Sequence, residues 1–132
     1  MFPFSVGDSA SKEHTITEST VIAYGNVSED HNPLHFDEKF ASSTRFGRRI
    51  AHGGILFGYL SAIMASTLPG PGTIYVSQFI EFKSPVYIGN TVLVEVKVAE
   101  IKSNGIVRLI NKISVENVLV ARGESVVLFE QN

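Results

Sequence analysis

A long stretch without formal charge occupies the middle of this chain. No Asp, Glu, Lys or Arg lies between Ile50 and Ile80, and an apolar segment runs from Ile55 to Leu68 within that stretch. Its hydrophobic residues occupy every face of a helix, so a helix here has to be surrounded by protein. Pro69 ends the segment before it reaches the roughly 20 apolar residues that a membrane span needs. The segment therefore predicts a buried central helix.

The second half of the chain alternates between apolar and polar residues with a period of two, which is typical of half-buried strands. Turn sequences separate the runs, at Gly89-Asn90, Asn104-Gly105 and Glu116-Asn117. Gln78 is the polar exception on the expected inward face of the first run. The residues expected to face inward are Ile74, Val76, Ile80, Phe82, Val92, Val94, Val96, Val98, Val107, Leu109, Ile113 and Val115. We expect an antiparallel meander curled around the central helix, an α+β arrangement.

Helical loops are expected before the central helix. Thr15, followed three residues later by Glu18, resembles a capping box and predicts a helix to about Val27. Asn32-Pro33 then predicts a turn, because the residue before proline is disfavoured in helical geometry. A second short helix is expected through residues 37–40.

Composition narrows the class of protein. The 132 residues fit one domain, expected to be residues 1–132, and are 44% hydrophobic with a net charge of -2, which indicates neither disorder nor a nucleic-acid footprint. The absence of cysteine excludes disulfides, thiolate metal sites and a cysteine nucleophile. The N-terminus lacks the pattern of a secretion signal or transit peptide, so a cytoplasmic location is expected.

Asp30 and His35 are the first candidates for catalysis. They lie five positions apart in Ser28-Glu29-Asp30-His31-Asn32-Pro33-Leu34-His35, where proline stiffens the turn between them. A carboxylate and an imidazole aimed at one point can hold a water and deprotonate it. The alternative is that Asp30 caps a helix and His35 packs near the surface, because Asp, Asn and Pro are ordinary turn residues.

His52-Gly53-Gly54 opens the central helix and is the second candidate segment. Glycine allows a ligand to approach closely, and the N–H groups of a first helical turn stabilise developing negative charge. Such an amide would act as an oxyanion hole for a thioester carbonyl. The alternative is a helix entry that packs tightly against the sheet.

Two further groups are weighed for binding. His31 and His35 have the spacing of a helical zinc site, but Pro33 disfavours a regular helix between them, so no metal is expected. The basic residues Arg45, Arg48 and Arg49 suit the phosphates of coenzyme A or an acidic carrier protein, or form a solvated cluster.

Several ordered blocks resemble the MaoC-like family of (R)-specific enoyl-CoA hydratases, also called type 2 hydratases, which have the hot-dog fold. The matching blocks cover nearly the whole chain. They are Asp30-x-Asn32-Pro33-x-His35, Phe46-Gly47, Ile50-Ala51-His52-Gly53, Leu68-Pro69-Gly70-x-Gly72 and Phe82-Lys83-x-Pro85-Val86-Tyr87-x-Gly89. Gly54 departs from the family pattern, in which a larger apolar residue is common.

The resemblance implies a single hot-dog domain and assigns roles to its residues. Asp30 and His35 would activate water, Gly53 would donate its N–H to the thioester oxygen, and Asn32 and Ser61 would support the site. The position of the central helix adds candidate residues for lining the acyl tail, namely Leu56, Tyr59, Leu60 and Ile63.

The implied reaction is reversible addition of water to a trans-2-enoyl thioester of coenzyme A or acyl carrier protein, giving a (3R)-hydroxyacyl thioester without a cofactor. A homodimer or higher homo-oligomer joined edge to edge is expected, with no nucleic acid or membrane as partner. The alternatives are a hot-dog acyl-CoA thioesterase, which would cleave the thioester, and a non-catalytic acyl-binding subunit.

Overall fold

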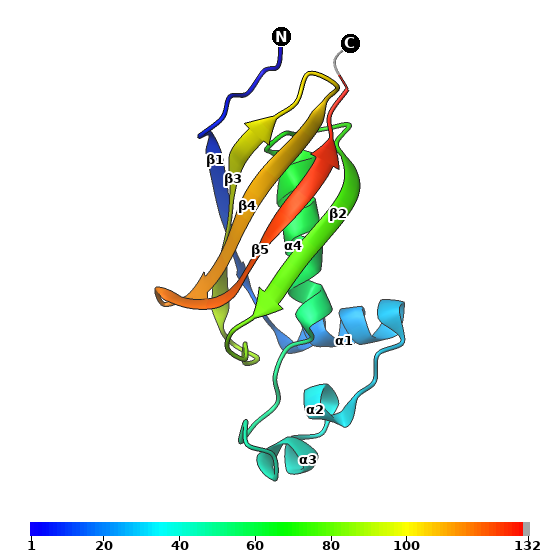
Figure 1. Cartoon of the computed structure of the whole chain (residues 1–132). Helices are drawn as coiled ribbons and strands as arrows, with labels where there is room; N and C mark the ends of the chain where they lie inside the picture. The colour runs from blue at the N-terminus through cyan, green and yellow to red at the C-terminus, as the bar shows by residue number, and fades with distance from the viewer. Residues whose placement is uncertain (131–132) are drawn as a thin grey trace.

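The computed structural model describes residues 1–130, so the last two residues of the expected domain 1–132 lie outside the described part. Nine elements follow one another along this part of the chain (Figure 1). They are β1 (Ser9–Thr15), α1 (Glu18–Ser28), α2 (Pro33–Phe36), α3 (Glu38–Ser42), α4 (Gly53–Ser66), β2 (Ile74–Phe82), β3 (Thr91–Ile101), β4 (Ile106–Val115) and β5 (Val118–Leu128).

The strands form one antiparallel sheet in the order β1-β3-β4-β5-β2. Consecutive hairpins join β3, β4 and β5, and the turn residues Glu116 and Asn117 both have positive φ, 48° and 67°, as two-residue hairpin turns require. The expected meander is therefore confirmed for these three strands. It is wrong for β2, which pairs with β5 across the sheet instead of with β3.

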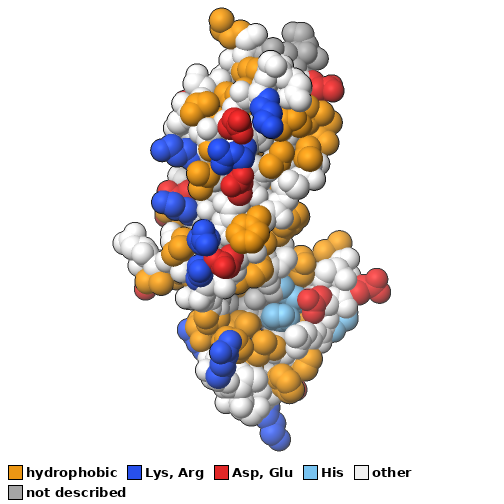
Figure 2. Space-filling model, viewed as in Figure 1, with side chains coloured by type: hydrophobic (Ala, Val, Ile, Leu, Met, Phe, Trp, Pro, Cys, Tyr) orange, Lys and Arg blue, Asp and Glu red, His pale blue; other side chains and the backbone are white. Residues whose placement is uncertain are grey.

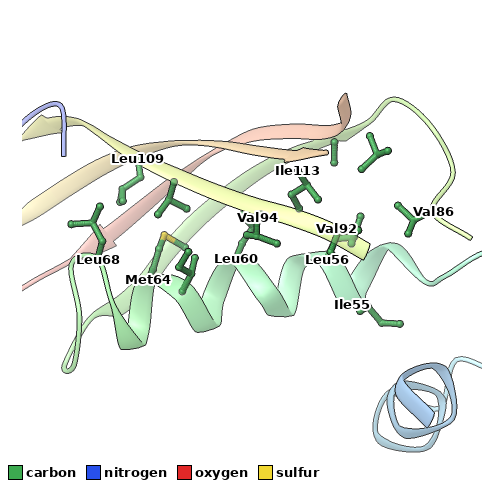
Figure 3. Close-up of a cluster of buried hydrophobic side chains, with 14 of the residues drawn as sticks. Ile55, Leu56, Leu60, Met64, Leu68, Val86, Val92, Val94, Leu109 and Ile113 are labelled. Carbon is green, nitrogen blue, oxygen red and sulfur yellow. The ribbon is translucent and has the colours of Figure 1, made fainter. Parts of the chain in front are cut away.

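Helix α4 is the expected buried helix, and it packs against the concave face of the sheet (Figures 1 and 3). Leu56, Leu60 and Met64 come from this helix and are at most 2% exposed. They meet Val94 of β3 and Leu109 of β4, which are fully buried. Within residues 1–130, no helix has both the length and the hydrophobicity to cross a bilayer.

Strand β1 was not expected from the sequence. It includes Thr15, the expected helix cap, so the first helix begins later than predicted. Thr15 pairs with Thr91 of β3, so it does not cap a helix. Thr17 is the N-cap of α1 instead, and its side chain forms a capping box with Thr20. The sequence of β1, Ser9-Ala10-Ser11-Lys12-Glu13-His14-Thr15, carries no apolar alternation because the strand is mostly exposed at the sheet edge. The expected second short helix is confirmed as α3, and α2 is an additional short helix in the segment that was expected to be a turn.

The inward face expected for β2 is largely wrong. Ile74 and Val76 are 54% and 56% exposed, whereas Phe82 is 51% exposed but its ring lies against Gly53 at the start of α4. The register against β5 shifts between Tyr75 and Ser77, which breaks the alternation, and β2 lies at an edge of the sheet. A bulge of this kind re-aims side chains along an edge strand.

Gln78 does face inward, where it meets other polar groups. Its Nε2 donates to Oδ1 of the buried Asn111 at 2.7 Å, and the Ser125 hydroxyl donates to the same oxygen at 2.9 Å. A buried polar side chain is tolerated when it is hydrogen-bonded in this way.

Candidate active site

The loop between α1 and α2 carries Asp30 and His35, and close packing sets its course. Glu29 ends α1 in the left-handed conformation, with φ of 64°. Gly25 lies against the Phe36 ring so closely that a Cβ at position 25 would overlap it. The absence of that Cβ lets α2 pack directly on α1. Pro33 is the first residue of α2, and the Asn32 side chain accepts a hydrogen bond from the Leu34 N–H. These two residues fix where α2 begins.

Asp30 and His35 are brought together, as their roles require. A carboxylate oxygen of Asp30, a ring nitrogen of His35 and a ring nitrogen of His52 lie within 4.8 Å of one another. Asp30 is exposed, whereas His35 is 8% exposed. One carboxylate oxygen accepts the N–H of Asn32 at 3.2 Å. Figure 2 shows histidine side chains gathered where the sheet meets the helices α1–α3.

The orientation of His35 follows from one hydrogen bond. Its Nδ1 lies 2.7 Å from the carbonyl oxygen of Ile50. A carbonyl can only accept, so Nδ1 carries the proton, and in the neutral ring Nε2 keeps its lone pair. His35 therefore has the tautomer of a general base.

His52 belongs to this cluster, although the sequence argument gave it no role. It is the N-cap of α4 and 2% exposed. Its Nε2 lies 3.0 Å from the backbone oxygen of Asp30, and its ring lies 3.9 Å from that of His35. The only signal in the sequence was its position immediately before Gly53.

Burial lowers the pKa of His52 below its ordinary value, and the neighbouring His35 acts in the same direction, against a hydrogen bond to the Asp30 backbone. As the pH falls, His52 of the unfolded chain is therefore protonated before His52 of the folded protein, which stabilises the unfolded state.

We expect the free energy of unfolding to decrease below about pH 6.5, the ordinary histidine pKa. Urea unfolding at pH 7.5 and 5.5 measures this decrease, and it should be smaller in His52→Gln. Equal decreases in both proteins would contradict the prediction.

A pocket of about 340 Å³ lies beside His35, and both Gly53 and Leu56 line it. Gly53 is the first residue of α4, and its N–H donates in none of the hydrogen bonds found among residues 1–130. First-turn amides have no acceptor within their own helix. The pocket therefore brings the base candidate and a free backbone donor to one space.

Gly54 stands where the family pattern commonly has a larger apolar residue, and the structure explains the difference. A Cβ at this position would overlap the hydroxyl of Tyr24 from α1. The phenol ring therefore takes the room that a larger side chain at 54 would fill. The pocket beside Gly53 is lined by neither of these residues.

The remaining predicted residues are distributed differently. Asn32 caps α2, and Ser61 is half-buried on α4, about two turns after Gly53. Leu60 and Ile63 lie in the core, 0% and 3% exposed, and neither lines the pocket beside His35. Tyr59 lines a separate groove between α1 and α4. Of the four residues expected to line the acyl tail, only Leu56 lies in the pocket beside His35.

Asp30, His35 and His52 are residue types that bind metal ions, and only one ring nitrogen of His52 is without a hydrogen bond. Its Nε2 is hydrogen-bonded to the Asp30 backbone, and its Nδ1 is enclosed and without a hydrogen-bond partner among the described residues. A cation bound here would therefore need the enclosed Nδ1 of His52 as its third protein ligand, three being the number typical of catalytic zinc.

The three arginines are used in three ways. Arg49 donates to the His35 backbone oxygen at 2.7 Å and pairs with Glu18 at 2.8 Å. Arg48 lies over the Tyr87 ring at 3.9 Å. Arg45 lines the pocket beside His35, together with Lys83.

This geometry suits acid–base chemistry on an activated carbonyl compound. The Asp30 carboxylate and the unprotonated Nε2 of His35 can accept hydrogen bonds from one water, and the free N–H of Gly53 can stabilise negative charge on a carbonyl oxygen in the adjoining pocket.

Comparison with known proteins identifies the family of this chain. The family described as "MaoC like domain" matches residues 7–120. A 3-hydroxybutyryl-CoA dehydratase of Methylorubrum extorquens is 43% identical over 85% of this chain and 72% of its own. An (R)-specific enoyl-CoA hydratase of Aeromonas caviae is 38% identical over 92% of both chains. The solved structure of an (R)-hydratase from A. caviae superposes with a TM-score of 0.93 and 36% identity, covering 97% of this chain and 98% of its own. The chain belongs to the MaoC-like domain family.

Proposed function

We propose that this chain is an (R)-specific enoyl-CoA hydratase, a hydro-lyase that adds water reversibly to a trans-2-enoyl thioester. The observation that carries the proposal is the convergence of Asp30 and His35 beside a pocket that Gly53 lines. The relatives named as (R)-specific hydratase and as dehydratase support both the hand of the product and the reversibility.

The reaction begins with the thioester oxygen accepting the N–H of Gly53, which withdraws electron density from carbon 3. A water hydrogen-bonded to Asp30 and His35 loses a proton to this pair as its oxygen bonds to carbon 3. The pair returns a proton to carbon 2, so water has been added across the double bond. No cofactor takes part in the proposed steps.

The test is an assay with crotonyl-CoA that follows the loss of the enoyl absorbance. Chiral analysis of the product should give the (3R)-hydroxy compound. Release of free coenzyme A thiol from a saturated acyl-CoA would favour a thioesterase instead. Absence of both reactions, with enoyl thioesters of several chain lengths, would favour a non-catalytic acyl-binding protein.

Arg45 and Lys83 suit the phosphates of the thioester carrier. Both lie at the pocket beside His35, and both are exposed. Arg48 and Arg49 are engaged by Tyr87 and by Glu18. Arg45 also lies over a ring, that of Phe46 at 4.9 Å, but of the three arginines it alone lines this pocket, which supports it as the arginine that meets coenzyme A or an acyl carrier protein in the cytoplasm, where we expect this protein.

A homodimer is proposed through strand β2. This strand lies at a sheet edge, and Val76 and Phe79 on it are 56% and 57% exposed. An edge strand with exposed apolar side chains readily pairs with another chain. A second copy of β2 placed across a two-fold axis would cover both edges at once.

Phe79→Glu is expected to convert the dimer to a monomer, because it places a charge in each half of the β2 contact. Light scattering after size-exclusion chromatography measures the mass. Ile110→Glu is the matched control, since Ile110 is 44% exposed but lies on β4, inside the sheet. A dimer that persists in Phe79→Glu, or that dissociates equally in both variants, would refute the β2 contact.

A further inference from the structure

His52 has no part in the proposed reaction, yet it is the most enclosed histidine of the chain. It is 2% exposed, and it occupies the N-cap of α4 without making a side-chain capping hydrogen bond. A polar N-cap residue normally accepts an N–H of the first turn. Because this ring does not, its partners elsewhere account for its burial.

Those partners are the two members of the candidate catalytic pair. The His52 Nε2–H donates to the backbone oxygen of Asp30 at 3.0 Å. Its ring packs on the His35 ring, with centroids 3.9 Å apart and planes inclined by 30°. The edge of Phe36 closes a third side, at 5.4 Å. One side chain thus contacts both residues that have to converge on water.

The protonation state of His52 follows from the same contacts. A carbonyl oxygen only accepts, so Nε2 carries the hydrogen. Nδ1 is enclosed and has no partner among the described residues, so a proton on Nδ1 would be buried without an acceptor. The charged and titratable groups that face the ring are Asp30, His35, His31 and, from α1, the Tyr24 phenol at 4.7 Å. His52 is therefore a neutral donor with a fixed direction.

The neighbours of His52 in the chain extend this arrangement. The carbonyl of Ile50 holds Nδ1 of His35, and Gly53 supplies the free N–H at the pocket. Residues 50–53 thus hold His35 by one carbonyl and Asp30 by one ring, and they place one free amide at the pocket. Asp30 otherwise depends on local contacts in its exposed loop, with Ser28 and Asn32.

We propose that His52 is a positioning residue, which aligns Asp30 and His35 with the Gly53 amide through its Nε2–H and its ring face. The inference rests on the proposed hydratase function. It predicts that loss of this contact lowers turnover without weakening substrate binding, because His52 does not line the pocket.

Three substitutions at position 52 separate the contribution of the Nε2–H donor from that of the aromatic ring. Gln places an amide nitrogen near the position of Nε2, Asn reaches only as far as Nδ1, and Phe keeps a ring without a donor. We expect His52→Asn and His52→Phe to lower kcat for crotonyl-CoA by up to about 10²-fold, the effect of misplacing a catalytic group by about 1 Å. KM should stay within about threefold, and His52→Gln should recover most of kcat. Thermal unfolding of each variant checks that it is folded under assay conditions.

An NMR measurement tests the same idea without activity. We expect the backbone amides of Asp30 and Asn32 to become more mobile in His52→Asn than in His52→Gln, and ring nitrogen shifts to show the Nε2–H tautomer of His52 in the wild type. Wild-type kcat in His52→Asn, equal loss in Gln and Asn variants, or unchanged mobility at Asp30 would overturn the positioning role. If the wild type hydrates no enoyl thioester, the proposed function fails, and the mobility comparison still decides whether His52 orders Asp30.

Discussion

Asp30→Asn and His35→Ala are each expected to lower kcat by about 10² to 10⁴-fold, the usual contribution of a positioned general acid or base. Asn at position 30 keeps an oxygen that can accept the Asn32 N–H, so the loop retains its turn while losing the proton acceptor. Ala at position 35 removes the imidazole whose Nε2 is free for water. Initial rates with crotonyl-CoA measure both effects.

The matched controls lie in the same loop. Glu29→Gln removes a neighbouring exposed carboxylate, and His31→Ala removes an exposed imidazole, which lies 5.8 Å from the Phe36 ring and outside the Asp30–His35–His52 cluster. Both controls should keep kcat within about threefold, because neither removes a group placed at the shared water. Near-wild-type turnover in Asp30→Asn or His35→Ala would eliminate that residue from the mechanism.

Gly53→Pro is expected to lower kcat by about 10² to 10³-fold, the effect of removing one oxyanion-hole donor. Gly53 is the first residue of α4, where proline is tolerated because the missing N–H has no partner within the helix. The preceding His52 has φ of -63° and ψ of 138°, which is the conformation favoured before proline. The substitution therefore removes the amide hydrogen and leaves the helix start intact.

Gly53→Ala is the control for the added side chain. A Cβ at position 53 would lie 2.7 Å from Cζ of Phe82, so in either variant the end of that ring has to shift. Only the proline variant also loses the N–H. Comparison of kcat in the two variants separates the added Cβ from the lost donor and the proline ring carbons, and circular dichroism checks the helix. Equal kcat in Ala and Pro variants would show that this amide does not stabilise the transition state.

Much of the fold could be predicted because burial leaves a periodic pattern in the sequence. The strands β3 and β4 face the core on one side, and their residues alternate accordingly, whereas the central helix is enclosed and was predicted from apolar residues on every face. The two edge strands were the difficult ones. β1 is too exposed to carry a pattern, and in β2 the register shift after Tyr75 turns Val76 outward.

The sequence by itself determined that one buried helix is covered by a sheet, and that Asp30, His35 and Gly53 are the residues suited to hydration chemistry. Only the tertiary structure decided that Asp30 and His35 lie together, that His35 lines a pocket with Gly53 and Leu56 while Leu60 lies in the core, and that His52 joins the pair. The physical reason is that periodicity and turn chemistry act between near neighbours along the chain. Which carbonyl or ring a histidine nitrogen meets depends on the packing of segments distant in sequence.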